Sequence, residues 1–182
     1  MFDPVEKLKE FIRHRSISAD SSAKEGMKGA QEFVSGLLSS LGFNVEVVRT
    51  DVHPIVLAHR GGDSSWPHVV IYGHYDVQPP EPLALWTSPP FEPTVRDGKL
   101  FARGAVDDKG QLWVHVMALA AHLGTRGTLP VNVIVVAEGE EEVGSVNLEN
   151  FIAMNAGRLA CDAVVISDST MFAPGVPSIL SS

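Results

Sequence analysis

Residues 137–144, AEGEEEVG, place four glutamates within five positions directly after the apolar run VNVIVV. Carboxylates this close repel one another, so the segment needs solvent or cations around it. A solvated turn is the commoner explanation of a charge run. A pair of divalent cations would also explain the crowding, with one glutamate as a ligand and its neighbour as the general base that activates a water molecule. The run by itself leaves both interpretations open.

A histidine and an aspartate, His74 and Asp76, follow another apolar run, VVIYG. In extended backbone the period of two places both side chains on one side. Asp76 could then accept a hydrogen bond from the second nitrogen of a metal-bound imidazole. Taken alone, a histidine at a strand end is more often a hydrogen-bonded structural residue.

Two adjacent aspartates, Asp107 and Asp108, stand in RGAVDDKG, where an expected strand passes into an expected helix. Aspartate is favourable at a helix N-cap and in the first turn, so capping alone would account for either residue. The alternative is that one of the two carboxylates bridges a pair of cations through its two oxygens.

These candidates share a position relative to the strands that must carry them. Imidazole or carboxylate groups follow each expected buried strand, and the last of them, Asp168, follows CDAVVIS. In open α/β sheets, sites form in the crevice outside the carboxyl ends of the strands. The sequence therefore predicts that separate segments converge on one site.

The pattern of apolar residues predicts the elements. Helices are expected from Asp3-Pro4 onward, from about Ala23 to Leu41, from about Asp108 to Leu123, and over SVNLENFIAMNAG. Strands are expected at FNVEVVRT, PIVLAHR, VVIYGH, LFARG, LPVNVIVVAE and CDAVVISD, and a long proline-rich loop follows VVIYGH. Late strands alternate with helices, whereas the first two are adjacent. We expect an α/β fold with a mixed, largely parallel sheet flanked by helices.

The bulk composition bounds the class of protein. The 182 residues fit one domain, and the net charge of −8 argues against nucleic acid or an anionic membrane as partner. The single cysteine, Cys161, excludes an internal disulfide and is expected to be a small buried hydrophobe. With no signal peptide and no membrane-length apolar run visible, the predicted location is cytoplasmic.

Common nucleotide-binding and hydrolase signatures are missing from the sequence. It contains no GxxxxGK[ST], GxGxxG, GxSxG or HExxH motif, which argues against a P-loop enzyme, a Rossmann dehydrogenase and a serine hydrolase. The histidines other than His74 have no comparable carboxylate neighbour and are expected to be surface or structural residues. They are His14, His53, His59, His68, His115 and His122.

Four segments in order, VVIYGHYDVQPP, RDGKLFARGAVDDKGQ, AEGEEEVGS and VVISDS, resemble the di-zinc peptidase superfamily of aminoacylase, carboxypeptidase G, succinyl-diaminopimelate desuccinylase and carnosinase. The similarity is strongest to the cytosolic dipeptidase and carnosinase-like branch, and it covers essentially the whole chain. It implies a three-layer zinc-peptidase-like catalytic domain and metal-dependent hydrolysis of a dipeptide or related amide.

The resemblance also assigns roles to six positions. They are His74, Asp107, Glu142 and Asp168 as metal ligands, with Asp76 and Glu141 as catalytic residues. Asp107 would bridge two divalent metals, most plausibly zinc, although manganese or cobalt also suits such ligands. Asp76 would orient the site and Glu141 would be the general base. Asp108 would be a structural neighbour, joined to Asp107 by a cis peptide bond.

The same resemblance implies parts that these residues do not include. Family members continue into a lid or dimerisation domain and a returning catalytic segment that supplies a second ligand histidine. We therefore expect residues 1–182 to be the N-terminal part of the catalytic domain, poorly active alone, with a full-length form that dimerises through the lid. The set of His74, Asp107 and Asp168 would be complete, whereas the second metal site would be incomplete. The rival hypothesis is a non-catalytic metal- or peptide-binding module of the same fold.

Overall fold

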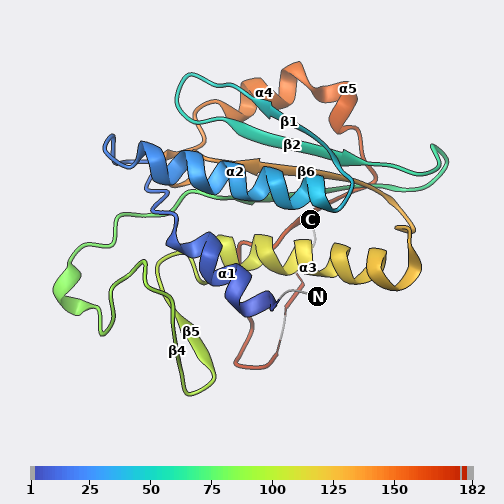
Figure 1. The fold of residues 1–182 in the computed structure, drawn as a ribbon. Coiled ribbons are helices and arrows are strands. Elements are labelled where there is room, and N and C mark those ends of the chain that lie inside the picture. The colour runs from blue at the N-terminus through green and yellow to red at the C-terminus, as the bar shows by residue number, and fades with distance from the viewer. Residues whose placement is uncertain (1–2, 177, 180–182) are drawn as a thin grey trace.

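The computed structural model describes residues 3–176 and 178–179, and at its centre lies a five-stranded sheet in the order β1-β2-β6-β3-β7 (Figure 1). The strands are β1 (Asn44–Val48), β2 (Ile55–Arg60), β3 (His68–His74), β6 (Asn132–Glu138) and β7 (Ala163–Ile166). β3 runs parallel to both β6 and β7, whereas β2 runs antiparallel to both β1 and β6. The predicted mixed α/β sheet with a parallel core is confirmed.

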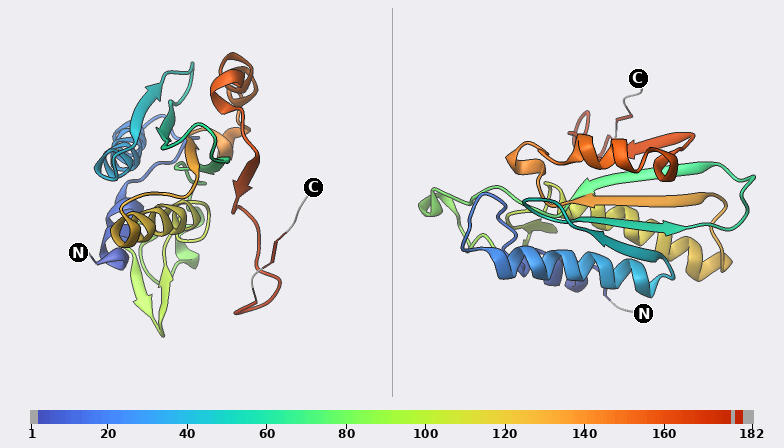
Figure 2. Two further views of the ribbon diagram at one scale, coloured as in Figure 1. Left: turned by 90° about the vertical axis from the view of Figure 1, so that its right-hand side faces the viewer. Right: turned by 90° about the horizontal axis from the view of Figure 1, so that it is seen from above.

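Helices cover both faces of this sheet, which gives three layers (Figure 2). One face carries α1 (Pro4–Arg13), α2 (Lys24–Ser40) and α3 (Lys109–Arg126), and the other carries α4 (Leu148–Met154) and α5 (Ala156–Leu159). Side chains of β6 alternate between the two cores: Val133 and Val135 belong to the first, Ile134 and Val136 to the second. Among the described residues, no helix combines the length and apolar character needed to cross a bilayer.

The first two helices begin and end as their sequences predict. The side chain of Asp3 accepts hydrogen bonds from the backbone N–H groups of Val5 at 2.8 Å and Glu6 at 3.3 Å, so it caps α1. Gly42 follows α2 with a φ of +77°, a conformation that favours glycine and stops the helix.

The connections hold more structure than the sequence indicated. The proline-rich loop after β3 contains the short helix η1 (Leu83–Leu85), and a hairpin of β4 (Thr94–Arg96) and β5 (Lys99–Phe101) projects beside it (Figure 1). The three-residue strand β4 was not predicted. The helix expected over SVNLENFIAMNAG is instead the two short helices α4 and α5, and η2 (Glu141–Val143) precedes them.

Two expectations of burial are wrong. Every residue of β7 is exposed, because β7 is the edge strand and no described element covers its outer side. Cys161, which precedes β7 at the same edge, is likewise exposed rather than buried.

Candidate metal centre

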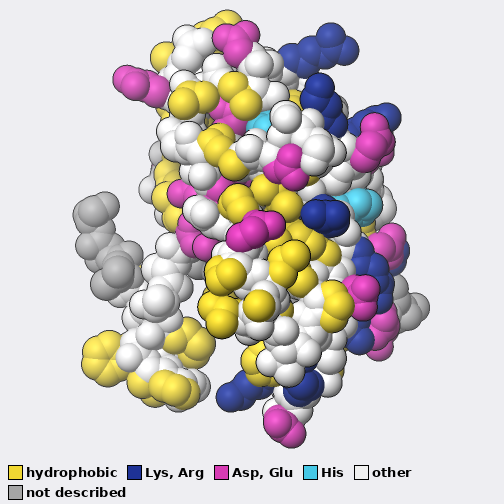
Figure 3. All heavy atoms as spheres, turned by 90° about the vertical axis from the view of Figure 1, so that its left-hand side faces the viewer, with side chains coloured by type: hydrophobic (Ala, Val, Ile, Leu, Met, Phe, Trp, Pro, Cys, Tyr) yellow, Lys and Arg dark blue, Asp and Glu magenta, His cyan; other side chains and the backbone are white. Residues whose placement is uncertain are grey.

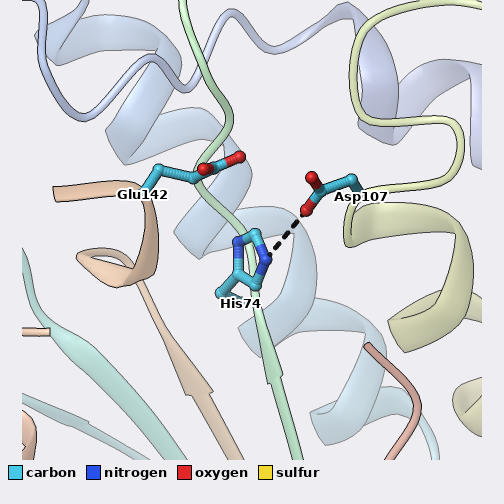
Figure 4. A group of neighbouring side chains, drawn as sticks. All are labelled: His74, Asp107 and Glu142. Atoms are coloured by element: carbon cyan, nitrogen blue, oxygen red, sulfur yellow. Dashed lines mark ion pairs between the residues drawn. The ribbon is translucent and has the colours of Figure 1, made fainter. Parts of the chain in front are cut away.

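The carboxyl ends of the parallel strands bring the predicted site residues together. His74 ends β3 and lies opposite Glu138 at the end of β6, while Asp107 precedes α3. Figure 4 shows His74, Asp107 and Glu142 approaching one another from three separate segments. One ligand atom from each of these three residues lies within 4.8 Å of the others.

The imidazole of His74 points one nitrogen into a group of carboxylates. Its Nε2 lies 3.2 Å from Asp107 Oδ1 and 3.6 Å from Asp168 Oδ2. Glu141 Oε2 is slightly farther, at 3.9 Å. His74 is 0% exposed, and Nε2 has no hydrogen-bond partner in the described part of the chain. A buried nitrogen that makes no hydrogen bond and has several carboxylates around it is unusual unless a further group belongs there.

The other ring nitrogen of His74 faces Asp76, as the sequence predicted. Nδ1 lies 3.1 Å from the backbone carbonyl oxygen of Asp76 and 3.3 Å from its Oδ1. The hydrogen bond is thus made with the carbonyl oxygen, and the carboxylate lies beside it. Asp76 Oδ2 in turn accepts from the backbone N–H of Glu142 at 3.1 Å. Asp76 therefore connects the end of β3 with η2.

The surroundings of His74 set its protonation state. Burial alone would lower the pKa of the imidazole. The Asp76 carboxylate close to Nδ1, joined by the charges of Asp108 and Glu141, outweighs burial and raises the pKa to about 10. Without a cation the ring is therefore protonated at neutral pH, and a metal that binds Nε2 must displace that proton.

Asp108 supports His74 rather than capping the following helix. It occupies the N-cap position of α3, but its side chain makes no capping hydrogen bond. Its Oδ2 instead accepts from the backbone N–H of His74 at 3.0 Å. A Cβ at Gly73 would lie 2.7 Å from this oxygen, so glycine is required for the approach. Burial raises the pKa of Asp108 to about 7. The capping interpretation is wrong for Asp108, whereas the cis bond between Asp107 and Asp108 is present.

The first glutamate of the run turns away from the centre. Glu138 is 1% exposed and accepts hydrogen bonds from the hydroxyl of Tyr72 and from Ser145 Oγ. Burial raises the pKa of Glu138. Glu138 is the last residue of an apolar strand, and this position in the sequence could have indicated that its side chain is buried.

The second glutamate joins loops that are distant in sequence. Glu140, also 1% exposed, accepts from Thr50 Oγ1 at 2.6 Å and from the backbone N–H of His53 at 2.9 Å. It also accepts from Asn147 Nδ2 at 2.9 Å. Hydrogen bonds to the buried carboxylates of Glu138 and Glu140 thus relieve part of the repulsion among the four glutamates. The sequence did not indicate these hydrogen bonds.

The remaining two glutamates, Glu141 and Glu142, face the centre and are partly exposed. Both oxygens of Glu142 accept hydrogen bonds from Gln78, a residue that sequence reasoning did not single out. Burial raises the pKa of Glu142. Figure 3 shows the end of the molecule at the left of Figure 1, where acidic side chains lie among hydrophobic ones.

The donor set suits a divalent cation. One neutral imidazole nitrogen and several carboxylate oxygens match the preferences of zinc and manganese. His74 Nε2, which has no hydrogen-bond partner in the described part of the chain, could bind such a cation together with the carboxylates around it. The residues present therefore fit such an ion, although the described part of the chain places only one histidine among them.

Comparison with known proteins gives consistent matches. Residues 70–179 match the family described as Peptidase family M20/M25/M40. The Cys-Gly metallodipeptidase dug1 of Schizosaccharomyces pombe is 35% identical over 178 residues, which cover 91% of this chain and 37% of that protein.

Solved structures give the same result. A metallo-carboxypeptidase of the M20 family from Sulfolobus solfataricus, Sso-CP2, has a TM-score of 0.85 at 35% identity, over 94% of this chain and 38% of its own. Human carnosine dipeptidase 1 has a TM-score of 0.86 at 32% identity, over 91% and 38%. The chain thus spans less than two fifths of the length of these relatives.

Proposed function

Because this chain belongs to peptidase family M20/M25/M40, we propose that it contributes the metal-binding centre of an enzyme that hydrolyses dipeptides or related amides. The observation that carries the proposal is the convergence of the carboxylates of Asp107, Asp168 and Glu141 on the buried Nε2 of His74, which makes no hydrogen bond in the described part of the chain. The relatives named as dipeptidases support the choice of substrate class.

Each residue then has a proposed role. His74, Asp107 and Asp168 form one ligand set, and Asp107 with Glu142 forms part of a second. Asp76 orients the imidazole of His74 from the opposite side. Zinc is our first choice of metal, with manganese or cobalt as alternatives.

The general base in this scheme is Glu141. A divalent cation, when bound, polarises the scissile carbonyl and makes water more acidic. In the described part of the chain the Glu141 carboxylate accepts no hydrogen bond, so it is available to take a proton from water and to donate it to the leaving amine. Glu142 and Asp76 hold the turn in which Glu141 stands.

The proposal also covers the whole protein. On the family resemblance, residues 1–182 form the N-terminal part of a catalytic domain whose complete form dimerises. The second metal site would need a further histidine, so these residues alone would hold one metal better than two and turn over substrate poorly. A cytoplasmic location is part of the same proposal.

The test uses the full-length protein. It would be purified without chelators, analysed for bound metal, and assayed on Cys-Gly, β-Ala-His and unrelated dipeptides before and after metal removal. We expect bound divalent metal and hydrolysis that is lost on chelation and restored by metal. A protein that binds metal and hydrolyses none of these amides would favour the binding-module hypothesis.

A further inference from the structure

Gln78 contacts one proposed ligand of the centre through both of its donor groups. Its backbone N–H donates to Glu142 Oε1 at 3.1 Å, and its side-chain amide donates to Glu142 Oε2 at 2.6 Å. A carboxylate held at both oxygens has its plane and direction fixed.

The backbone that carries Gln78 is itself anchored. The preceding residue, Val77, is fully buried, and its N–H donates to the carbonyl oxygen of Ser16 at 2.8 Å. In the opposite direction, the N–H of Glu142 donates to Asp76 Oδ2. The segment 76–78 and Glu142 therefore hold each other through three hydrogen bonds.

The type of residue at position 78 fits this task. A carboxylate has about four acceptor positions, so each oxygen of Glu142 keeps one for a cation after accepting from Gln78. A lysine or arginine would bring a positive charge to the place that a cation must occupy, and an acidic residue would repel Glu142. A neutral amide orients the ligand and leaves its charge intact.

We propose that Gln78 is a positioning residue that preorganises Glu142 for a divalent cation. This inference rests on the metal-dependent function proposed above. Because the residue is exposed, replacing it should change metal affinity more than it changes the stability of the fold.

The test compares Gln78→Leu with the wild type and with Gln31→Leu, all as the full-length protein, because Glu142 belongs to the proposed metal set that residues 1–182 leave incomplete. Gln31 is a matched control, since its amide donates to Ser35 Oγ at 2.9 Å within α2, away from the carboxylates. Each metal-free protein would be titrated with Zn²⁺ and Mn²⁺ against a chromogenic chelator, and its thermal unfolding measured with and without the metal.

For Gln78→Leu we expect one of the two metal equivalents to bind about 10–100-fold more weakly. The stabilisation that excess metal gives would then be smaller by about 1.4 kcal/mol for each tenfold loss of affinity, with metal-free unfolding as in the wild type. Gln31→Leu should bind metal like the wild type. Gln78→Asn, which keeps a shorter amide, should recover part of the affinity and serves if the leucine variant fails to fold.

Two results would overturn the inference while leaving the proposed function intact. One is equal affinity of Gln78→Leu and the wild type, and the other is a loss of affinity matched by an equal loss of metal-free stability. A full-length wild-type protein that binds neither cation would overturn both the inference and the proposed function.

Discussion

His74 Nε2 lies 3.2 Å from Asp107 Oδ1. His74 ends the central strand β3, whereas Asp107 stands just before α3, a helix that packs on one face of the sheet. Neither residue could form a cation-binding site alone. Their approach depends on the sheet ending where it does and on the two segments meeting at that edge.

Replacing His74 by alanine should abolish tight metal binding. The loss should exceed the roughly 10–100-fold that removal of a supporting contact costs, because an imidazole donor itself disappears. Titration with Zn²⁺ against a chromogenic chelator measures this. His59→Ala, at an exposed position at the end of β2, is the control and should bind like the wild type. Unchanged affinity in His74→Ala would place the metal elsewhere.

Glu141→Gln in the full-length protein should separate chemistry from binding. Loss of the base should lower kcat/KM by about 10²–10⁴-fold, while metal content stays constant. Steady-state kinetics on a dipeptide, paired with metal analysis, provides the measurement. Glu149→Gln, in the exposed first turn of α4, should behave as the wild type. If Glu141→Gln retains full turnover, another group must act as the base.

Glu140→Gln should destabilise the fold at neutral pH by about 2 kcal/mol, because donors that now face a carboxylate would face an amide. Burial alone would raise the pKa of Glu140, but the hydrogen bonds from Thr50, His53 and Asn147 outweigh it and lower the pKa below its ordinary 4.5. The stabilisation is therefore complete above pH 4.5 and is lost as the pH falls through the lower folded value.

Urea unfolding of the wild type and of Glu140→Gln at a series of pH values measures this effect. The difference in unfolding free energy should shrink in acid. A difference that is constant with pH would show that the charge of Glu140 is not what the surrounding donors stabilise.

Lys109 should make stability rise with pH in the alkaline range. It is fully buried, and its Nζ donates to the carbonyl oxygens of His14 at 2.7 Å and Phe11 at 3.2 Å. Burial lowers its pKa from 10.5 to about 7, so between these values the unfolded chain binds more protons than the folded one. The free energy of unfolding then increases with pH, by up to about 1.4 kcal/mol per unit.

Lys109→Met removes this titration. The wild type should therefore gain stability relative to Lys109→Met between about pH 7 and about pH 9, as measured by urea unfolding. Lys28→Met, exposed on α2, should run parallel to the wild type. A flat difference between wild type and Lys109→Met would mean that the buried amine keeps its proton throughout this range.

The sequence was sufficient for the parts of the structure that depend on local pattern. Apolar runs predicted the central strands, and the residues that follow them predicted at which end of the sheet the candidate side chains meet. The resemblance to the metallopeptidase superfamily is confirmed by the family match. The cis bond between Asp107 and Asp108, which only the resemblance implied, is present as well.

Contacts between distant segments could not be predicted in this way. Nothing near Gln78 in the sequence indicates that it will meet Glu142, and nothing near Thr50 points to Glu140. Such pairs depend on how loops close over the sheet. The exposure of Cys161 follows from β7 being an edge strand, which is a property of strand order rather than of composition.

The carboxylate of Glu140 joins the loop between β1 and β2 to the turn that carries Glu141 and Glu142. That loop contributes no proposed ligand and no proposed base. A substitution at Thr50 would nevertheless remove a hydrogen bond to Glu140, the residue that precedes the proposed base Glu141. If the site is defined by what influences its geometry rather than by what touches the substrate, residues 50–53 belong to it. Variation in this loop is then a way to shift the proposed base and the proposed ligand without replacing either of them.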